Sequence, residues 1–299
     1  MSFDMVDAHH HLWDLKAVRY PWLLEKGVRR FFGDPTPIQK NYHVADFQAD
    51  IDRLPISQSV HIQVGAAPED SLAETRWLQA AAEETTSRGL PSAIVAFCDL
   101  AQEDAPAQLD AQSAFGRLRG IRQIVGRSLE EDAQTGTDAL LDSPVWRRNL
   151  AGLAARDLSF DLQLIPPQLP RVIEVLKDCE DLSVALCHCG SPWDRTPEGL
   201  KFWKKHTAAL AELPRVHCKL SGFGMFDSGW DADSVRELVR HLIDCFGPDR
   251  CMFGSNFPVD KLYRDYRSVF AQFRALVEDL TPAEQEAMLG GNARRFYRL

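Results

Sequence analysis

The chain has 299 residues, 45% of them apolar and 26% charged, which is the composition of a globular protein with a large core. Its net charge of −9, without any basic stripe, argues against nucleic acid and anionic membranes as partners. Seven cysteines at no repeated spacing favour reduced thiols over disulfides, and no segment is long enough to span a membrane, so we expect a cytoplasmic protein.

The first predicted strand, residues 5–9, leads into three consecutive histidines. Side chains alternate along a strand, so His9 and His11 should emerge on one side and His10 on the other. Two adjacent imidazoles form half of a typical metal or acid–base site. An expression tag is the alternative, but a tag would be longer and would lie in a flexible Gly/Ser context.

A long aromatic segment, residues 16–43, follows this strand and includes Tyr20, Trp22, Phe31 and Phe32. Connections of this length are either functional or disordered, and the aromatic side chains favour an ordered lid. Trp22 is therefore a candidate for contact with the substrate.

Strand-like and helix-like segments alternate along the rest of the chain. Eight runs are predicted as strands: 5–9, 57–64, 92–97, 118–124, 158–164, 182–188, 215–220 and 250–254. The amphipathic segments between them include 71–88, 143–156, 168–178, 201–212 and 234–246. Asp70 and Ser143 are the expected N-caps of the first two.

Eight strand–helix repeats predict a (β/α)8 barrel, an α/β fold, in a single domain spanning residues 1–299. An open doubly wound sheet is the competing architecture, but no glycine-rich phosphate-binding loop follows the first strand.

In such a barrel the chemistry takes place at the C-terminal ends of the strands. Polar and ionisable residues occupy nearly every predicted strand end: His9, His11, Gln63, Asp99, Arg122, Gln123, Asp161, Gln163, His188, Lys219, Ser221, Ser255 and Asn256. The bodies of the strands are apolar, so this segregation predicts an active site at that rim.

Three histidines on one rim, His9, His11 and His188, could hold a divalent ion such as Zn²⁺ with one position open for water. The set lacks a clear carboxylate ligand, since neither Asp161 nor Asp260 has a diagnostic spacing. His188 alone would more often be a buried core histidine, and its place on the rim favours function.

Positive side chains on the same rim suit a substrate or transition state that carries negative charge. Arg122 and Lys219 would supply this charge, although a salt bridge to a neighbouring carboxylate is an equally simple role for each.

The opening motif, residues 6–13 followed by Tyr20-Pro21-Trp22, resembles the amidohydrolase superfamily. More narrowly, it is similar to the amidohydrolase-2 branch, which contains sugar lactonases and the pyrone-dicarboxylate lactonase. Further matches in the same order cover nearly the whole chain: 120–123, 158–163, 188–192, 218–222, 253–259 and 291–297.

The resemblance implies a barrel that hydrolyses a cyclic ester. His9, His11 and His188 would line the site, and Arg122 is similar to an arginine that contacts the substrate carboxylate or carbonyl.

Three positions depart from the family pattern. Asn256 stands where members carry an aspartate that binds metal and accepts the proton of water, and an amide cannot accept that proton. Cys187 replaces a frequent aspartate, and Gln163 stands where metal-rich members have histidine. Some lactonases of this branch work without a metal.

We therefore expect a hydrolase that opens a small sugar lactone or muconolactone by attack of water on the ring carbonyl. The proton would be accepted by His188, by His9 or His11, or by Asp260, with Asn256 orienting the water. Arg122, Lys219 or a metal would stabilise the oxyanion, and Gln63, Gln163 and Trp22 would help to bind substrate.

Two other functions stay open at this point. One is a metal-dependent decarboxylase of a small aromatic or unsaturated acid. The other is a catalytically impaired barrel that only binds a small acid. The expected partner is a small lactone or carboxylate, and the oligomeric state is open, with a homo-oligomer as one option.

Overall fold

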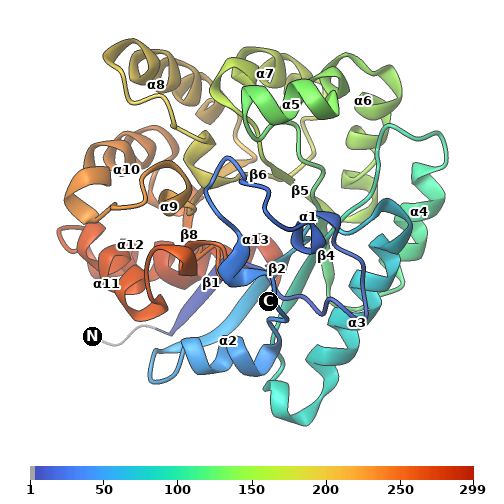
Figure 1. Ribbon diagram of the computed structural model, residues 1–299. Helices are drawn as coiled ribbons and strands as arrows, with labels where there is room; N and C mark the ends of the chain where they lie inside the picture. Colours follow the sequence, from blue (N-terminus) through green and yellow to red (C-terminus); the bar gives the residue numbers. More distant parts are fainter. Residues whose placement is uncertain (1–3) are drawn as a thin grey trace.

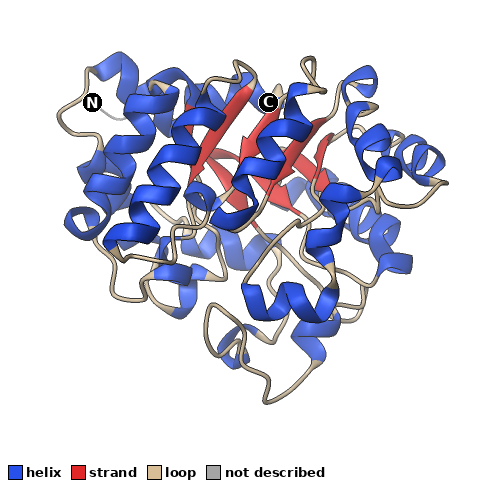
Figure 2. Cartoon of the chain, turned by 90° about the horizontal axis from the view of Figure 1, so that it is seen from above, coloured by secondary structure: helices blue, strands red, loops and turns tan. Residues whose placement is uncertain are grey.

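The computed structural model describes residues 4–299, apart from the side chain of Asp138. Eight parallel strands follow one another around a barrel in the order β1 to β8, with helices around them (Figures 1 and 2). Their bounds are β1 Met5–His10, β2 Ile56–Ile62, β3 Ala93–Ala96, β4 Leu118–Ile121, β5 Ser159–Leu162, β6 Val184–Leu186, β7 Val216–Leu220 and β8 Cys251–Phe253.

Thirteen α-helices lie among residues 4–299, joined by short 3₁₀ turns. They are α1 Pro21–Leu24, α2 Val44–Asp50, α3 Ser71–Glu83, α4 Ala105–Ser113, α5 Leu129–Thr135, α6 Pro144–Ala151, α7 Leu169–Lys177, α8 Pro197–Ala211, α9 Phe223–Phe226, α10 Ala232–Phe246, α11 Tyr266–Leu276, α12 Pro282–Glu286 and α13 Asn292–Tyr297. No helix of the described chain is both long and apolar enough to cross a membrane.

The predicted (β/α)8 barrel is confirmed, and all eight predicted strands are present. Several strands are shorter than predicted. The sixth ends at Leu186 rather than at His188, because His188 has a φ of 53° and begins a left-handed turn. The chain therefore leaves the sheet at the residue that carries the expected chemistry.

Backbone hydrogen bonds join the first strand to the segment that follows the eighth. The N–H of Asn256 donates to the carbonyl of His9, and the N–H of His11 donates to that of Phe257, each at 2.7 Å. These two bonds hold the N-terminal histidines against the end of β8, where the barrel closes.

The interior of the barrel is filled by small and branched side chains that point inward from the strands. They form one buried cluster with residues of α13: Val6, Ala8, Val60, Ile62, Ala93, Val95, Ala185, Met252, Ala293, Phe296 and Tyr297. The C-terminal helix thus packs against the inward-facing side chains, and the interior is a packed core and not a channel.

Candidate active site

The histidines of β1 point as the alternation predicts. The rings of His9 and His11 lie 5.1 Å apart between centroids, and the ring of His9 lies 4.5 Å from that of His188. His10 points away and stacks on Phe47 of α2 at 4.2 Å. Three imidazoles, two from the end of β1 and one from the turn after β6, therefore converge at one rim.

His188 is placed by the turn after β6 and by the loop after β7. Its Nδ1 lies 3.0 Å from the Ser221 hydroxyl. Gly222 packs so closely that a Cβ there would lie 2.5 Å from this nitrogen. With Nδ1 engaged by Ser221, Nε2 is left to face the cavity described below.

His11 is held in one tautomer by its neighbours. Its Nδ1 donates to the carbonyl of Ile62 at 2.7 Å, and its Nε2 lies 3.3 Å from Oδ1 of Asn256. Burial lowers the pKa of His11 to about 3 and the pKa of His188 well below 6.5, with a further contribution from Arg122 in both cases. Both rings are therefore neutral at neutral pH.

Arg122 follows β4 and is 4% exposed. Its Nη1 donates to Oε1 of Gln163 at 3.0 Å, and its Nη2 donates to the backbone carbonyl of Gln63. Its Nε is buried without a hydrogen-bond partner among the described residues. The guanidinium group is thus fixed in orientation and keeps a donor for a ligand.

These side chains surround a cavity of about 300 Å³. Six of the residues predicted from the sequence line it: His11, Trp22, Arg122, Gln163, His188 and Asn256. Phe31 and Phe32 also line it, so the aromatic segment after β1 forms one wall, as predicted.

Four other predicted residues lie outside the lining of this cavity. His9 and Lys219 are fully buried, and the Gln63 side chain accepts a hydrogen bond from the N–H of Gly65 at 2.6 Å. Asp260 is 2% exposed, and burial raises its pKa to about 8. Gln63 supports the site through its carbonyl to Arg122.

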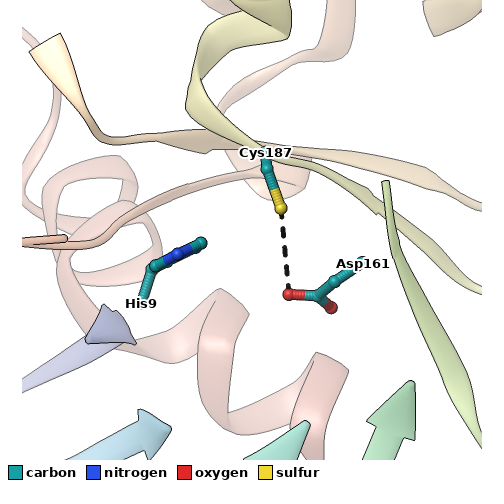
Figure 3. A group of neighbouring side chains, drawn as sticks. All are labelled: His9, Asp161 and Cys187. Carbon is teal, nitrogen blue, oxygen red and sulfur yellow. Dashed lines mark hydrogen bonds between the residues drawn. The ribbon is translucent and has the colours of Figure 1, made fainter. Parts of the chain in front are cut away.

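A tight cluster of potential metal ligands is formed by His9, Asp161 and Cys187 (Figure 3). Their ligand atoms lie within 4.8 Å of one another, and both ring nitrogens of His9 lack a hydrogen-bond partner in the described chain. These three residues are the first place to test for a metal ion.

The surroundings of this cluster do not fit a divalent cation. Lys219 forms a fully buried ion pair with Asp161, which also accepts a hydrogen bond from the Tyr297 hydroxyl at 2.9 Å. Burial raises the pKa of Cys187 to about 12, so its sulfur is a protonated thiol that would have to lose its proton to bind a metal ion. The carboxylate already has a cation, and a second positive charge beside it would be repelled.

Nearly the whole chain matches the model of one protein family. The family model described as Amidohydrolase matches residues 6–299. The chain belongs to the amidohydrolase family. The resemblance inferred from the motifs is therefore confirmed, and it supports a hydrolase.

Individual relatives of this amidohydrolase cover nearly its full length. An uncharacterized protein of Sinorhizobium fredii is 37% identical over 99% of this chain and 98% of its own. An L-fucono-1,5-lactonase of Burkholderia ambifaria is 28% identical, covering 98% and 95%. A solved amidohydrolase of Burkholderia multivorans with bound zinc is 27% identical, with a TM-score of 0.82 and 99% coverage of both chains.

Two basic residues of the amidohydrolase cavity were not among the predicted site residues. Arg30 and Arg127 both line it. Arg127 lies in the loop after β4, five residues beyond Arg122. Loops that follow barrel strands build the active site, so this position could have predicted Arg127 as a site residue. Arg30 precedes Phe31 in the aromatic segment, and only the folded lid brings it to the site.

Proposed function

We propose that this amidohydrolase opens a small lactone by attack of water on the ring carbonyl. The observation that carries the proposal is that Arg122 and the neutral His188 line one cavity. The relatives named L-fucono-1,5-lactonase, at 28% and 29% identity, support this reaction class. They leave the identity of the lactone to experiment.

In the proposed reaction, Nε2 of His188 takes a proton from the attacking water while the oxygen adds to the carbonyl carbon. Arg122 donates hydrogen bonds to the oxygen that becomes negative, which is the usual largest contribution to such catalysis. Breaking the ring C–O bond then releases an alkoxide. That alkoxide takes the proton from His188 and gives the hydroxy acid.

Asn256 has a different role from the aspartate found in other members of the family. It lines the cavity beside His11, and its amide can donate to and accept from a water molecule without taking its proton. We propose that it orients the water. The His9, Asp161 and Cys187 cluster does not fit a divalent ion. The predicted set of His9, His11 and His188 stays a prediction, and no step here is routed through an ion.

The direct test is acid release from a panel of sugar lactones and muconolactones, followed in a pH-stat. We expect turnover by the native protein and a roughly 10²–10⁴-fold lower kcat in His188→Ala, because the general base is removed. His206→Ala, on the outer helix α8, is the matched control and should retain full activity. Native-like activity of a folded His188→Ala variant would refute this mechanism.

Two added measurements, carbon dioxide release and binding of a small acid, separate the two alternative functions. A decarboxylase would release carbon dioxide from a small aromatic or unsaturated acid and would consume no lactone. An impaired barrel would bind a small acid and turn over neither class of compound. The Asn256 amide is the observation that favours this last alternative, because it removes the usual carboxylate base.

A further inference from the structure

The outer part of the active-site cavity holds two arginines that the proposed hydrolysis does not use, together with the acids Glu25 and Glu131. Besides Arg122, the cavity is lined by Arg30 from the aromatic segment and by Arg127 from the loop after β4. The two come from different elements, and neither is required to bind the ring carbonyl.

The backbone around Arg127 is firmly held. The N–H groups of Val125 and Gly126 both donate to the carbonyl of Gln163, at 2.9 and 3.2 Å. The N–H of Arg127 itself donates to the Asp132 carboxylate at 2.9 Å. The carboxylate therefore fixes the main chain at this residue.

The guanidinium group of Arg127 is left with an unused donor. Its Nη1 is buried and has no hydrogen-bond partner among residues 4–299 as described. Burial lowers the pKa of Arg127, the charges of Glu131 and Asp132 oppose this, and the positive charge of Arg30 adds a smaller lowering. A buried donor without a partner is unfavourable, and an anion placed there would satisfy it.

Arg30 is positioned by a tight turn and is only partly neutralised. Its N–H and carbonyl pair with those of Gly33 at 2.8 and 2.9 Å. Its Nη2 lies 3.4 Å from a carboxylate oxygen of Glu25, and its buried Nε has no partner in the described chain. This arginine too keeps a donor available.

The remaining acid in this part of the cavity is engaged in holding the lid. Glu131 of α5 accepts a hydrogen bond from the backbone N–H of Phe31 at 3.2 Å. Its charge raises the pKa of Arg127. Among the ion pairs of the described residues, none joins Glu131 to Arg127. Both arginines therefore line the cavity, and each keeps a buried N–H donor without a partner in the described chain.

We propose that Arg127, together with Arg30, binds a carboxylate of the substrate at the outer end of the cavity. This inference rests on the proposed lactonase function and narrows its substrate class to lactones that carry a carboxylate away from the ring carbonyl. Arg122 holds the carbonyl and Arg127 holds the distant acid. The cavity of about 300 Å³ suits a compound of this small size.

The test compares two lactones that differ at one carbon, galactono-1,4-lactone and galactaro-1,4-lactone, where a terminal hydroxymethyl group becomes a carboxylate. We expect the native protein to prefer the carboxylated lactone. Arg127→Gln should raise KM for that compound about tenfold to a hundredfold, as expected for a lost charged hydrogen bond, and leave KM for the neutral lactone within twofold.

Arg76→Gln is the matched control, because Arg76 is an exposed arginine on α3 and its replacement removes the same charge. It should leave both KM values unchanged. Arg127→Lys keeps the charge without the forked donors and should give an intermediate KM. If Arg127→Gln does not fold, Arg30→Gln provides the same comparison with a smaller expected effect.

A binding measurement separates this inference from the reaction itself. Succinate should bind to the native protein in calorimetry, and Arg127→Gln should bind it at least tenfold more weakly. If no lactone is turned over and succinate still requires Arg127, the hydrolase proposal fails and the anion site stands. The anion site would be overturned if Arg127→Gln changed KM equally for both lactones. It would also be overturned if Arg127→Gln bound succinate as tightly as Arg76→Gln does.

Discussion

Asp260 shows how burial can keep a carboxyl group protonated at neutral pH. It is 2% exposed, and its Oδ1 has no hydrogen-bond partner in the described chain. Gly224 packs so closely that a Cβ there would lie 2.4 Å from this oxygen. Burial raises the pKa of Asp260 from 3.8 to about 8, against a smaller opposing effect of Asn256.

This raised pKa makes the stability of the protein depend on pH. Between pH 4 and pH 8 the folded protein holds a proton on Asp260 that the unfolded chain does not, so its contribution to stability falls as pH rises through this window. Asp260→Asn cannot ionise and escapes this loss. We measure the unfolding free energy of Asp260→Asn minus that of the native protein in urea. This difference should be about 2–4 kcal/mol larger at pH 8.5 than at pH 5.

An equal difference in unfolding free energy at the two pH values would show that Asp260 titrates normally in the folded protein. The buried environment would then not control its charge. The role of Asp260 as a base would regain support, because an ionised carboxylate accepts protons at neutral pH.

The aromatic segment is the element that gives the site its wall. Trp22 of α1 donates from its indole N–H to the carbonyl of Val64, just after β2, at 2.7 Å. Its ring packs edge-on against Trp13 and Phe32, each at 6.0 Å between centroids. One hydrogen bond and two ring contacts thus fix a short helix over the cavity.

Trp22→Phe removes the hydrogen bond and keeps an aromatic ring. We expect KM for the best lactone to rise about twofold to tenfold, which corresponds to a single lost hydrogen bond, with little change in kcat. Limited proteolysis between residues 25 and 33 should become faster. Trp77→Phe on α3 is the control, and an equal effect of both variants would mean that the wall does not depend on this bond.

Helix starts were predicted with mixed success, for local reasons. The Ser143 hydroxyl accepts the N–H of Trp146 at 3.2 Å, which confirms the predicted cap of α6. Asp70 was predicted to cap α3. It occupies the N-cap position, but its side chain makes no capping hydrogen bond. Its carboxylate accepts the N–H of Arg19 at 3.0 Å and so anchors the aromatic segment.

At the scale of the whole molecule, the C-terminal helix completes the barrel. Tyr297 of α13 reaches into the interior and donates to Asp161, which is paired with Lys219. The ammonium group of Lys219 also lies 5.1 Å from the Tyr297 ring. Helix α13 therefore stabilises a buried charged pair in the interior, outside the lining of the candidate active-site cavity.

Tyr297→Phe tests this arrangement with a minimal change. The buried carboxylate would lose one donor while keeping Lys219, so we expect urea unfolding to show a loss of about 1–3 kcal/mol. The kcat/KM should stay within twofold, because the hydroxyl does not line the cavity. An unchanged unfolding free energy would show that the hydrogen bond from Tyr297 to Asp161 does not stabilise the fold. A large loss of kcat would show that the Asp161–Lys219 ion pair takes part in the reaction.

The sequence by itself determined the barrel, the family and the rim on which the three histidines meet. Alternation of short apolar strands with amphipathic helices has few packed solutions, and parallel strands bring their C-terminal ends together. His11, Arg122, Gln163, His188 and Asn256 could therefore be assigned to the site from their positions after strands.

Only the tertiary structure decided the depth at which each side chain lies and which partner it meets. Lys219 was a candidate for substrate contact, but the barrel turns it inward to Asp161, away from the cavity. Arg30 reaches the cavity only because the lid folds over it. Such contacts join residues far apart in the chain, and local sequence patterns carry no information on the register and packing that create them.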